Sequence, residues 1–214
     1  MMTYGEFVEF LFNRADERKE WYFAEDFVQP EFEADVQIDF ATRVFTDAEQ
    51  LAGKYTESQF CLGLNYLINP ACSNFCYSFV DTSVEEVKRV SVVDSMYAVF
   101  KGVFNEKCTE LSSERAAIGP ATFSFLCYMW WDVFPRHGTP HNVDLESTDR
   151  AILITLEKIM SLDSLGCKES ALHGLGHWYS ARPEFVERVI DRNSAKIPMA
   201  LRKYSKNARE GRVQ

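Results

Sequence analysis

Apolar residues recur at helical spacing along almost the whole chain, and this periodicity is the feature that most restricts its fold. In residues 4–19, Phe7, Phe10 and Leu11 fall on one side of a helix, as expected when one face packs against a core. The pattern continues in residues 35–53, 81–108, 146–161 and 182–194. No segment alternates apolar and polar residues as a half-exposed strand does. The sequence therefore predicts an all-α fold.

Two kinds of local signal refine this prediction. Thr56 and Gln59 stand at the spacing of a capping box, which predicts a helix beginning there. DTSVEE (81–86) predicts a second capping box. ATFSFLCYMWWDVF (121–134) is apolar on nearly every side, so we expect it to form a fully buried central helix.

The chain is expected to form one domain over residues 1–214, because no Ser/Gly-rich linker divides it. We expect an N-terminal helix and cap (1–34), paired helices (35–192) and a basic C-terminal helix or tail (193–214). Helices paired through short turns favour a right-handed α-α superhelix. QFCLGLNYL (59–67) and SALHGLGHW (170–178) share Gly-Leu at the same offset, which is consistent with a repeat.

Charge is unevenly distributed in this chain, whose net charge is −9. Residues 1–60 hold fourteen acids against five bases, whereas residues 191–214 hold seven bases against two acids. An acidic body repels nucleic-acid phosphates, so we expect no nucleic-acid partner. No window is apolar for long enough to span a membrane, and the first residues do not resemble a signal peptide. We therefore expect no membrane partner and a cytoplasmic location.

Six cysteines are dispersed among apolar residues, as in QFCLGL and SFLCYMWW. Without an export signal, such residues are expected to be reduced and buried. Cys72 and Cys76 have no second pair at the spacing of a zinc knuckle. We therefore disfavour a structural zinc site made by these thiols.

ESALHGLGHW (169–178) places His173 and His177 four residues apart in a predicted helix. At this spacing both imidazoles lie on one face, so they could reach one metal ion. Gly174 stands where an HExxH metalloprotease has its glutamate, which excludes that chemistry. A metal site would need further ligands, and the remaining histidines are His137 and His141 in RHGTPH.

A structural joint, meaning a place where helices pack closely, is the favoured interpretation of the same stretch. Glycine costs a helix about 0.5–1 kcal/mol relative to alanine, so Gly174 and Gly176 indicate close approach by a neighbour. The predicted joint consists of His173, Gly174, Gly176, His177, Trp178, Trp130 and Trp131. We expect neither a cofactor nor a catalytic residue here.

Two further groups of residues carry charge beside aromatic side chains. Asp132 lies in the apolar 121–134 segment, and Arg136 one turn later is its expected structural partner. The second group could be a surface contact patch or, equally, a cap over the first helices. It consists of Phe23, Glu25, Asp26, Phe27, Glu31, Phe32 and Glu33.

CKESALHGLGHWYSARPEFVERVI (167–190) resembles one HEAT-like repeat: an Ala/Leu/Gly-rich helix, a short turn with Arg-Pro, and an amphipathic helix. WWDVFPRHG followed by ESALHGLGHW is similar to a group of uncharacterised bacterial HEAT-like proteins, mainly over residues 120–190. This resemblance implies an all-helical repeat fold and a bacterial source. It carries no established catalytic residues.

The resulting functional hypothesis is a non-enzymatic helical-repeat protein that binds another protein, and the acidic net charge is compatible with a basic partner. A bacterial toxin-immunity protein or an assembly adaptor fits that description by analogy at the level of the fold. The alternative is a metal- or small-ligand-binding enzyme that uses the pairs His137/His141 and His173/His177. A self-associating subunit, such as a homodimer, is a third hypothesis.

Overall fold

Helices make up most of the structure, a computed structural model that describes residues 2–15, 19–116, 118–136 and 143–213. The longer helices are α1 (Tyr4–Phe12), α2 (Ala34–Thr46), α4 (Glu57–Ile68), α6 (Glu86–Val99), α9 (Phe123–Val133), α10 (Glu146–Met160), α11 (Leu165–Trp178) and α12 (Pro183–Asn193). The shorter ones are α3 (Ala48–Lys54), α5 (Phe75–Ser78), α7 (Asn105–Lys107), α8 (Ser113–Ala116) and α13 (Arg202–Ala208). A π-helical turn, Phe100–Phe104, follows α6, and 3₁₀ turns occupy Trp21–Phe23, Val143–Leu145, Ser194–Lys196 and Met199–Leu201. The described residues contain no strand, which confirms the all-α prediction.

Local capping explains where several helices begin. The predicted capping box of Thr56 and Gln59 is present at α4, and Thr3 forms another with Glu6 at α1. Each box gives a partner to backbone N–H groups that have none within the first turn. Ser164 caps α11 by accepting a hydrogen bond from the Cys167 N–H.

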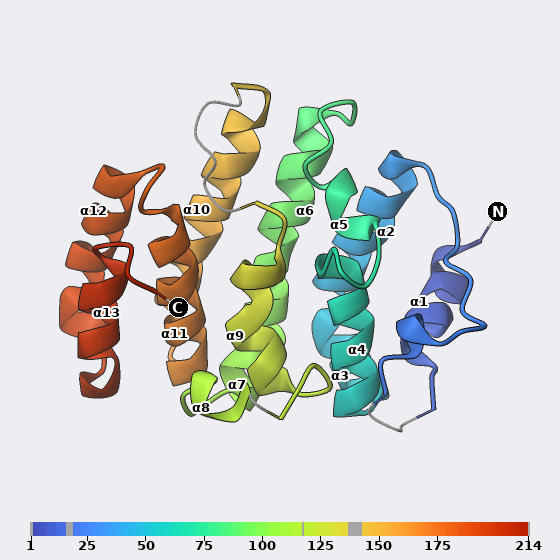
Figure 1. The fold of residues 1–214 in the computed structure, drawn as a ribbon, viewed down its shortest axis with the longest axis horizontal. Helices are drawn as coiled ribbons and strands as arrows, with labels where there is room; N and C mark the ends of the chain where they lie inside the picture. The colour runs from blue at the N-terminus through green and yellow to red at the C-terminus, as the bar shows by residue number, and fades with distance from the viewer. Residues whose placement is uncertain (1, 16–18, 117, 137–142, 214) are drawn as a thin grey trace.

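The helices pack in two layers (Figure 1). In one layer α1, α4, α9, α11 and α13 follow one another, each packed against the next. In the other layer α2 packs against α6, and α6 packs against α10. Between the layers lies one continuous core, so the described residues form a single compact domain. In Figure 1 the N-terminal helix and the pair α12–α13 lie at opposite ends of the long axis.

Both α4 and α11 are buried along almost their full lengths. These are the helices that carry the shared Gly-Leu pair. In α4 a Cβ at Gly63 would lie 2.5 Å from Phe12 Cδ1 and 3.0 Å from the Leu11 carbonyl oxygen. The missing side chain therefore allows α1 to pack directly on α4.

Four local expectations were wrong. The helix predicted over 4–19 ends at Phe12, and beyond it the Arg14 guanidinium lies over the rings of Phe10 and Trp21. The helix predicted over 35–53 divides at Asp47 into α2 and α3. The capping box predicted at 81–86 is absent, since α6 begins at Glu86 without a side-chain cap. The helix α9, predicted to be buried on all sides, buries one face, which consists of Leu126, Cys127, Trp130 and Trp131.

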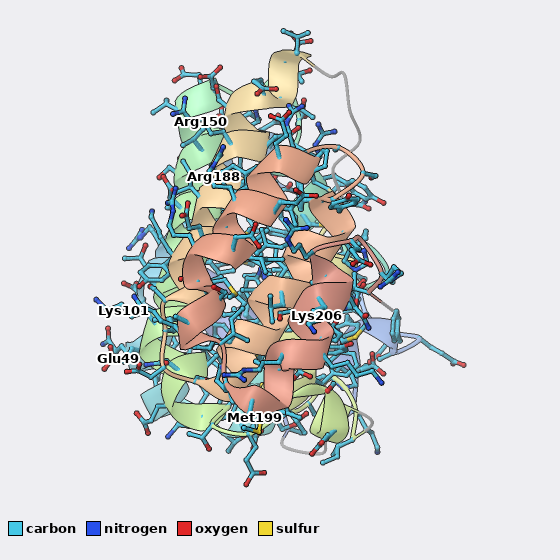
Figure 2. All side chains as sticks on the ribbon, turned by 90° about the vertical axis from the view of Figure 1, so that its left-hand side faces the viewer. Glu49, Lys101, Arg150, Arg188, Met199 and Lys206 are labelled. Carbon is cyan, nitrogen blue, oxygen red and sulfur yellow. The ribbon has the colours of Figure 1, made fainter. Side chains whose placement is uncertain are left out.

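The C-terminal segment packs against the rest of the domain. Leu201, Ser205 and Ala208 are buried, and α13 contacts α11. Figure 2 views this end of the molecule, with Arg188 and Lys206 on its outer surface and the exposed Met199 at its lower edge. The predicted basic tail is therefore a short helix whose inner face belongs to the core.

All six cysteines are buried free thiols. Burial raises the pKa of Cys72 to about 11 and that of Cys76 to about 12. At neutral pH these thiols are therefore protonated, and they pack as small apolar side chains. Among the described residues, no helix combines the length and apolar character required to cross a bilayer.

The packing of α1 on α4 yields a stability prediction. We expect Gly63→Ala to lower the free energy of unfolding by about 1–3 kcal/mol, because the new methyl group overlaps Phe12 and Leu11. Gly53→Ala in α3 is the matched control, since no atom lies within 4 Å of its added Cβ. It is expected to stabilise the protein by about 0.5–1 kcal/mol. Equal effects of both substitutions in urea unfolding would contradict this account of Gly63.

Candidate functional site

The close approach of α9 and α11 places the candidate site. A Cβ at Gly174 would lie 2.8 Å from Trp131 Cγ and 2.6 Å from Leu156 Cδ2. The helix α11 therefore fits between Trp131 of α9 and Leu156 of α10 only because residue 174 has no side chain. The residue after Trp131 is Asp132, and this packing brings its carboxylate to the face of α11 that carries His173 and His177.

The carboxylate of Asp132 bridges the two histidines. The His173 Nε2–H donates to Asp132 Oδ2 at 2.8 Å, and the His177 Nε2–H donates to Oδ1 at 2.7 Å. The two Nε2 atoms lie 3.1 Å apart. Because an ionised carboxylate can only accept hydrogen bonds, both Nε2 atoms carry protons in this arrangement.

Two tyrosines hold the inner histidine in place. The Nδ1 atom of His173 makes a hydrogen bond with the hydroxyl of Tyr204 in α13. The rings of His173 and Tyr204 are nearly parallel, 4° apart, and the Tyr128 ring centroid lies 4.7 Å from that of His173. The orientation of His173 is thus determined by three helices, α9, α11 and α13.

Burial differs across the site. His173 is 1% exposed, whereas the side chains of Asp132 and His177 are each 26% exposed. Burial alone would raise the pKa of Asp132, but the hydrogen bonds from His173 and His177 outweigh it and hold that pKa well below its ordinary value. Burial, followed by the neighbouring Tyr128, raises the pKa of Tyr204, which therefore stays protonated. The site thus combines an ionised carboxylate, two imidazoles and a neutral phenol.

The ion pair expected between Asp132 and Arg136 was wrong. Arg136 instead donates to Asp149 of α10, from Nε to Oδ1 at 2.6 Å and from Nη2 to Oδ2 at 2.7 Å. Both side chains are buried. Asp132 is directed toward α11 because its neighbour Trp131 packs on Gly174, so its partners are histidines more than forty positions away in the sequence. No spacing rule links residues at that separation, and no sequence signal pointed to Tyr204.

The other residues assigned to the joint have different positions. Trp131 packs on Gly174, but Trp130 points into the core, where it contacts Phe45, Phe100 and Phe104. The neighbour of Gly176 is Val213, near the C-terminus, and Trp178 is buried. His137 and His141 lie outside the described residues, so the four-histidine arrangement is not placed.

The N-terminal aromatic and acidic group divides into two parts. Phe27 and Phe32 turn inward: Phe27 contacts Phe10 and Trp21, and Phe32 contacts Phe7. Phe23 is 59% exposed, and the nearby Val28 is 83% exposed. The segment therefore caps the first helices and also presents apolar side chains at the surface.

Acidic side chains of the same segment are close to these exposed apolar residues in the sequence. Glu25, Asp26, Glu31 and Glu33 are all exposed, and within the described residues none has a cationic partner. A surface hollow of about 580 Å³ adjoins them, lined in part by Glu31 and Glu33. We call Phe23, Val28 and these four acids the acidic surface.

The buried ion pair yields a second stability prediction. Asp149→Asn leaves the Arg136 guanidinium buried without its counter-charge, so we expect the free energy of unfolding to fall by about 3–5 kcal/mol. The matched control is Glu157→Gln, which breaks an ion pair with the largely exposed Arg192. Its expected cost is less than about 1 kcal/mol. Urea unfolding at pH 7 measures both values, and similar costs would contradict the role assigned to Asp149.

Comparison with known proteins leaves the family of this chain open. No protein-family model matches it, and no curated protein or solved structure matches it either. The resemblance of residues 120–190 to bacterial HEAT-like proteins therefore stays a prediction.

Proposed function

We propose that this protein is a non-enzymatic helical-repeat protein that binds a basic protein partner through the acidic surface. The two layers of successive helices support a right-handed α-α superhelix of the HEAT-like type. Such folds bind partners over extended faces. The same proposal includes a bacterial source and a cytoplasmic location.

One observation carries the proposal: four exposed carboxylates of one short segment have no cationic partner among the described residues. Like charges gathered on a short segment repel one another, and a basic partner would remove that repulsion. Some acids elsewhere on the surface are paired, as Asp35 and Asp39 are with Lys88. The absence of such pairing at Glu25, Asp26, Glu31 and Glu33 favours a partner that supplies the positive charge.

Exposed apolar side chains also favour the acidic surface as the binding site. Phe23 and Val28 stand among the acids, and apolar anchors surrounded by charge are typical of protein interfaces. The adjoining hollow offers a place for a partner side chain. Lysine or arginine residues beside an apolar group are therefore the partner chemistry that we expect.

Within this class we propose two roles, a toxin-neutralising immunity protein or an assembly adaptor. Both require a small acidic protein that binds one partner without transforming it. They differ in the partner, which identification of the bound protein would establish. Binding of a second copy of the chain would instead support the self-associating subunit.

The test compares partner co-purification by the unmodified protein with that by two triple variants that each remove three negative charges. The tagged protein and the triple variant Glu25→Gln/Asp26→Asn/Glu31→Gln are used to capture proteins from a lysate of the source organism. We expect the unmodified protein to retain one stoichiometric partner, which moderate salt releases, and the triple variant to lose it.

The control removes the same charge elsewhere. Glu114, Asp163 and Glu184 are exposed acids distant from the acidic surface in the sequence. A triple variant at these positions is expected to retain the partner. If both triple variants behave alike, or if no partner is retained, the acidic surface is not the binding site.

A further inference from the structure

The cluster of Asp132, His173 and His177 is remote in sequence from the acidic surface and takes no part in the proposed binding of a protein. Its three side chains each offer one ligand atom, and these atoms lie within 4.8 Å of one another. Two imidazole nitrogens and a carboxylate oxygen are ligands that zinc and neighbouring divalent metals accept. We propose that these three residues form a binding site for a divalent transition-metal ion of the zinc class.

The distances between the ligand atoms fit such an ion after small side-chain movements. A tetrahedral Zn²⁺ with ligand bonds of about 2.0–2.2 Å holds its donor atoms roughly 3.3–3.6 Å apart. Here Asp132 Oδ2 lies 2.8 Å from His173 Nε2, Oδ1 lies 2.7 Å from His177 Nε2, and the two Nε2 atoms lie 3.1 Å apart. One ligand atom from each of the three residues can be chosen so that all lie within 4.8 Å of one another. An expansion of well under 1 Å, within the range of side-chain rotation, makes room for the ion.

The protonation of the metal-free cluster also favours a cation. Both Nε2 atoms carry a proton toward Asp132, which holds two N–H groups side by side only 3.1 Å apart. Their partial positive charges oppose each other. A metal ion removes this opposition, because each neutral imidazole then carries its one proton on Nδ1 and both Nε2 atoms direct lone pairs to the ion.

Tyr204 occupies the position of a supporting residue for a metal ligand. Histidines that bind metals almost always donate a hydrogen bond from their second ring nitrogen to a fixed partner. The second nitrogen of His173 is Nδ1, and its partner is the Tyr204 hydroxyl. With Nε2 bound to a metal, the imidazole proton lies on Nδ1, and this N–H donates a hydrogen bond to the Tyr204 hydroxyl oxygen. A ring with both nitrogens so engaged is pre-organised for binding.

The exposure pattern gives the ion a route from solvent. His173 forms the buried side of the cluster, while Asp132 and His177 are partly exposed. An ion can therefore enter from the surface, and water can complete its coordination. Among the described residues the cluster supplies three ligands, so a tetrahedral ion would take a fourth ligand such as water.

The backbone supporting the cluster belongs to two closely packed helices. Asp132 lies on α9, and the two histidines lie one turn apart on α11, whose backbone is buried. The contact of Trp131 with Gly174 sets the distance between these helices. Ligands on packed helices lose little conformational entropy on binding, which favours affinity.

Direct titration with Zn²⁺ tests the proposal. The purified chain, stripped with chelator and kept reduced, is titrated by calorimetry. We expect one Zn²⁺ per chain and a rise in the thermal unfolding midpoint on binding. His177→Gln and Asp132→Asn, which change partly exposed side chains, are expected to weaken binding by at least about 100-fold. Circular dichroism of both metal-free variants establishes that they fold.

Three controls separate this site from other sources of binding. The double variant His137→Gln/His141→Gln removes the other histidines and is expected to bind Zn²⁺ normally. Co²⁺ should give the absorption of a nitrogen- and oxygen-ligated ion without a charge-transfer band from cysteine thiolates. Mg²⁺ and Ca²⁺, which prefer all-oxygen sites, are expected not to compete.

The supporting role of Tyr204 has its own measurement. Tyr204→Phe removes the hydroxyl that holds Nδ1 of His173, so we expect Zn²⁺ affinity to fall about 10- to 100-fold. Tyr77→Phe, at an exposed tyrosine, is the matched control and should leave affinity unchanged. The proposal is overturned if the unmodified chain binds no Zn²⁺, if His177→Gln and Asp132→Asn bind it normally, or if the cobalt spectrum shows thiolate ligands.

Discussion

The contact between Trp131 and Gly174 is the constraint on which the C-terminal half of the structure depends. It sets how closely α9 and α11 pack, and it aims Asp132 at the two histidines of α11. The position of His173 in turn fixes where Tyr204, and with it α13, meets the domain. A larger residue at position 174 would separate these helices, because neither Trp131 nor Leu156 has space to withdraw within a close-packed core.

Sequence reasoning succeeded where local rules decide the structure. The all-α class follows from apolar periodicity, and the start of α4 follows from Thr56 and Gln59, whose capping box involves neighbouring residues alone. It failed where distant residues compete. In the segment 81–86 several side chains could cap a helix, and α6 begins without using one. The helix α9 looked wholly apolar, yet several of its side chains, among them Tyr128 and Asp132, are partly exposed.

The candidate site, too, was predictable where local spacing decides it and not where distant residues do. The histidine pair could be found from its spacing of four residues, and the two glycines correctly pointed to a crowded helix. The third member could not be found, because Asp132 had a nearer candidate partner in Arg136, which the fold assigns to Asp149. Asp132 reaches His173 only through the packing of two helices, and such packing depends on side-chain shape across the whole core. Tyr204 is likewise brought into place by the docking of α13 on α11.

The uneven distribution of charge has a consequence for how this molecule moves in solution. Its acidic surface lies in the segment between α1 and α2, and its C-terminal residues, rich in lysine and arginine, lie at the opposite end of the long axis (Figure 1). Charge separated in this way gives the molecule an electric dipole moment. The electric field of a basic surface exerts a torque on that dipole, which turns the acidic end toward the basic surface before contact. Orientation would thus precede encounter, and added salt would weaken it by shortening the reach of the field.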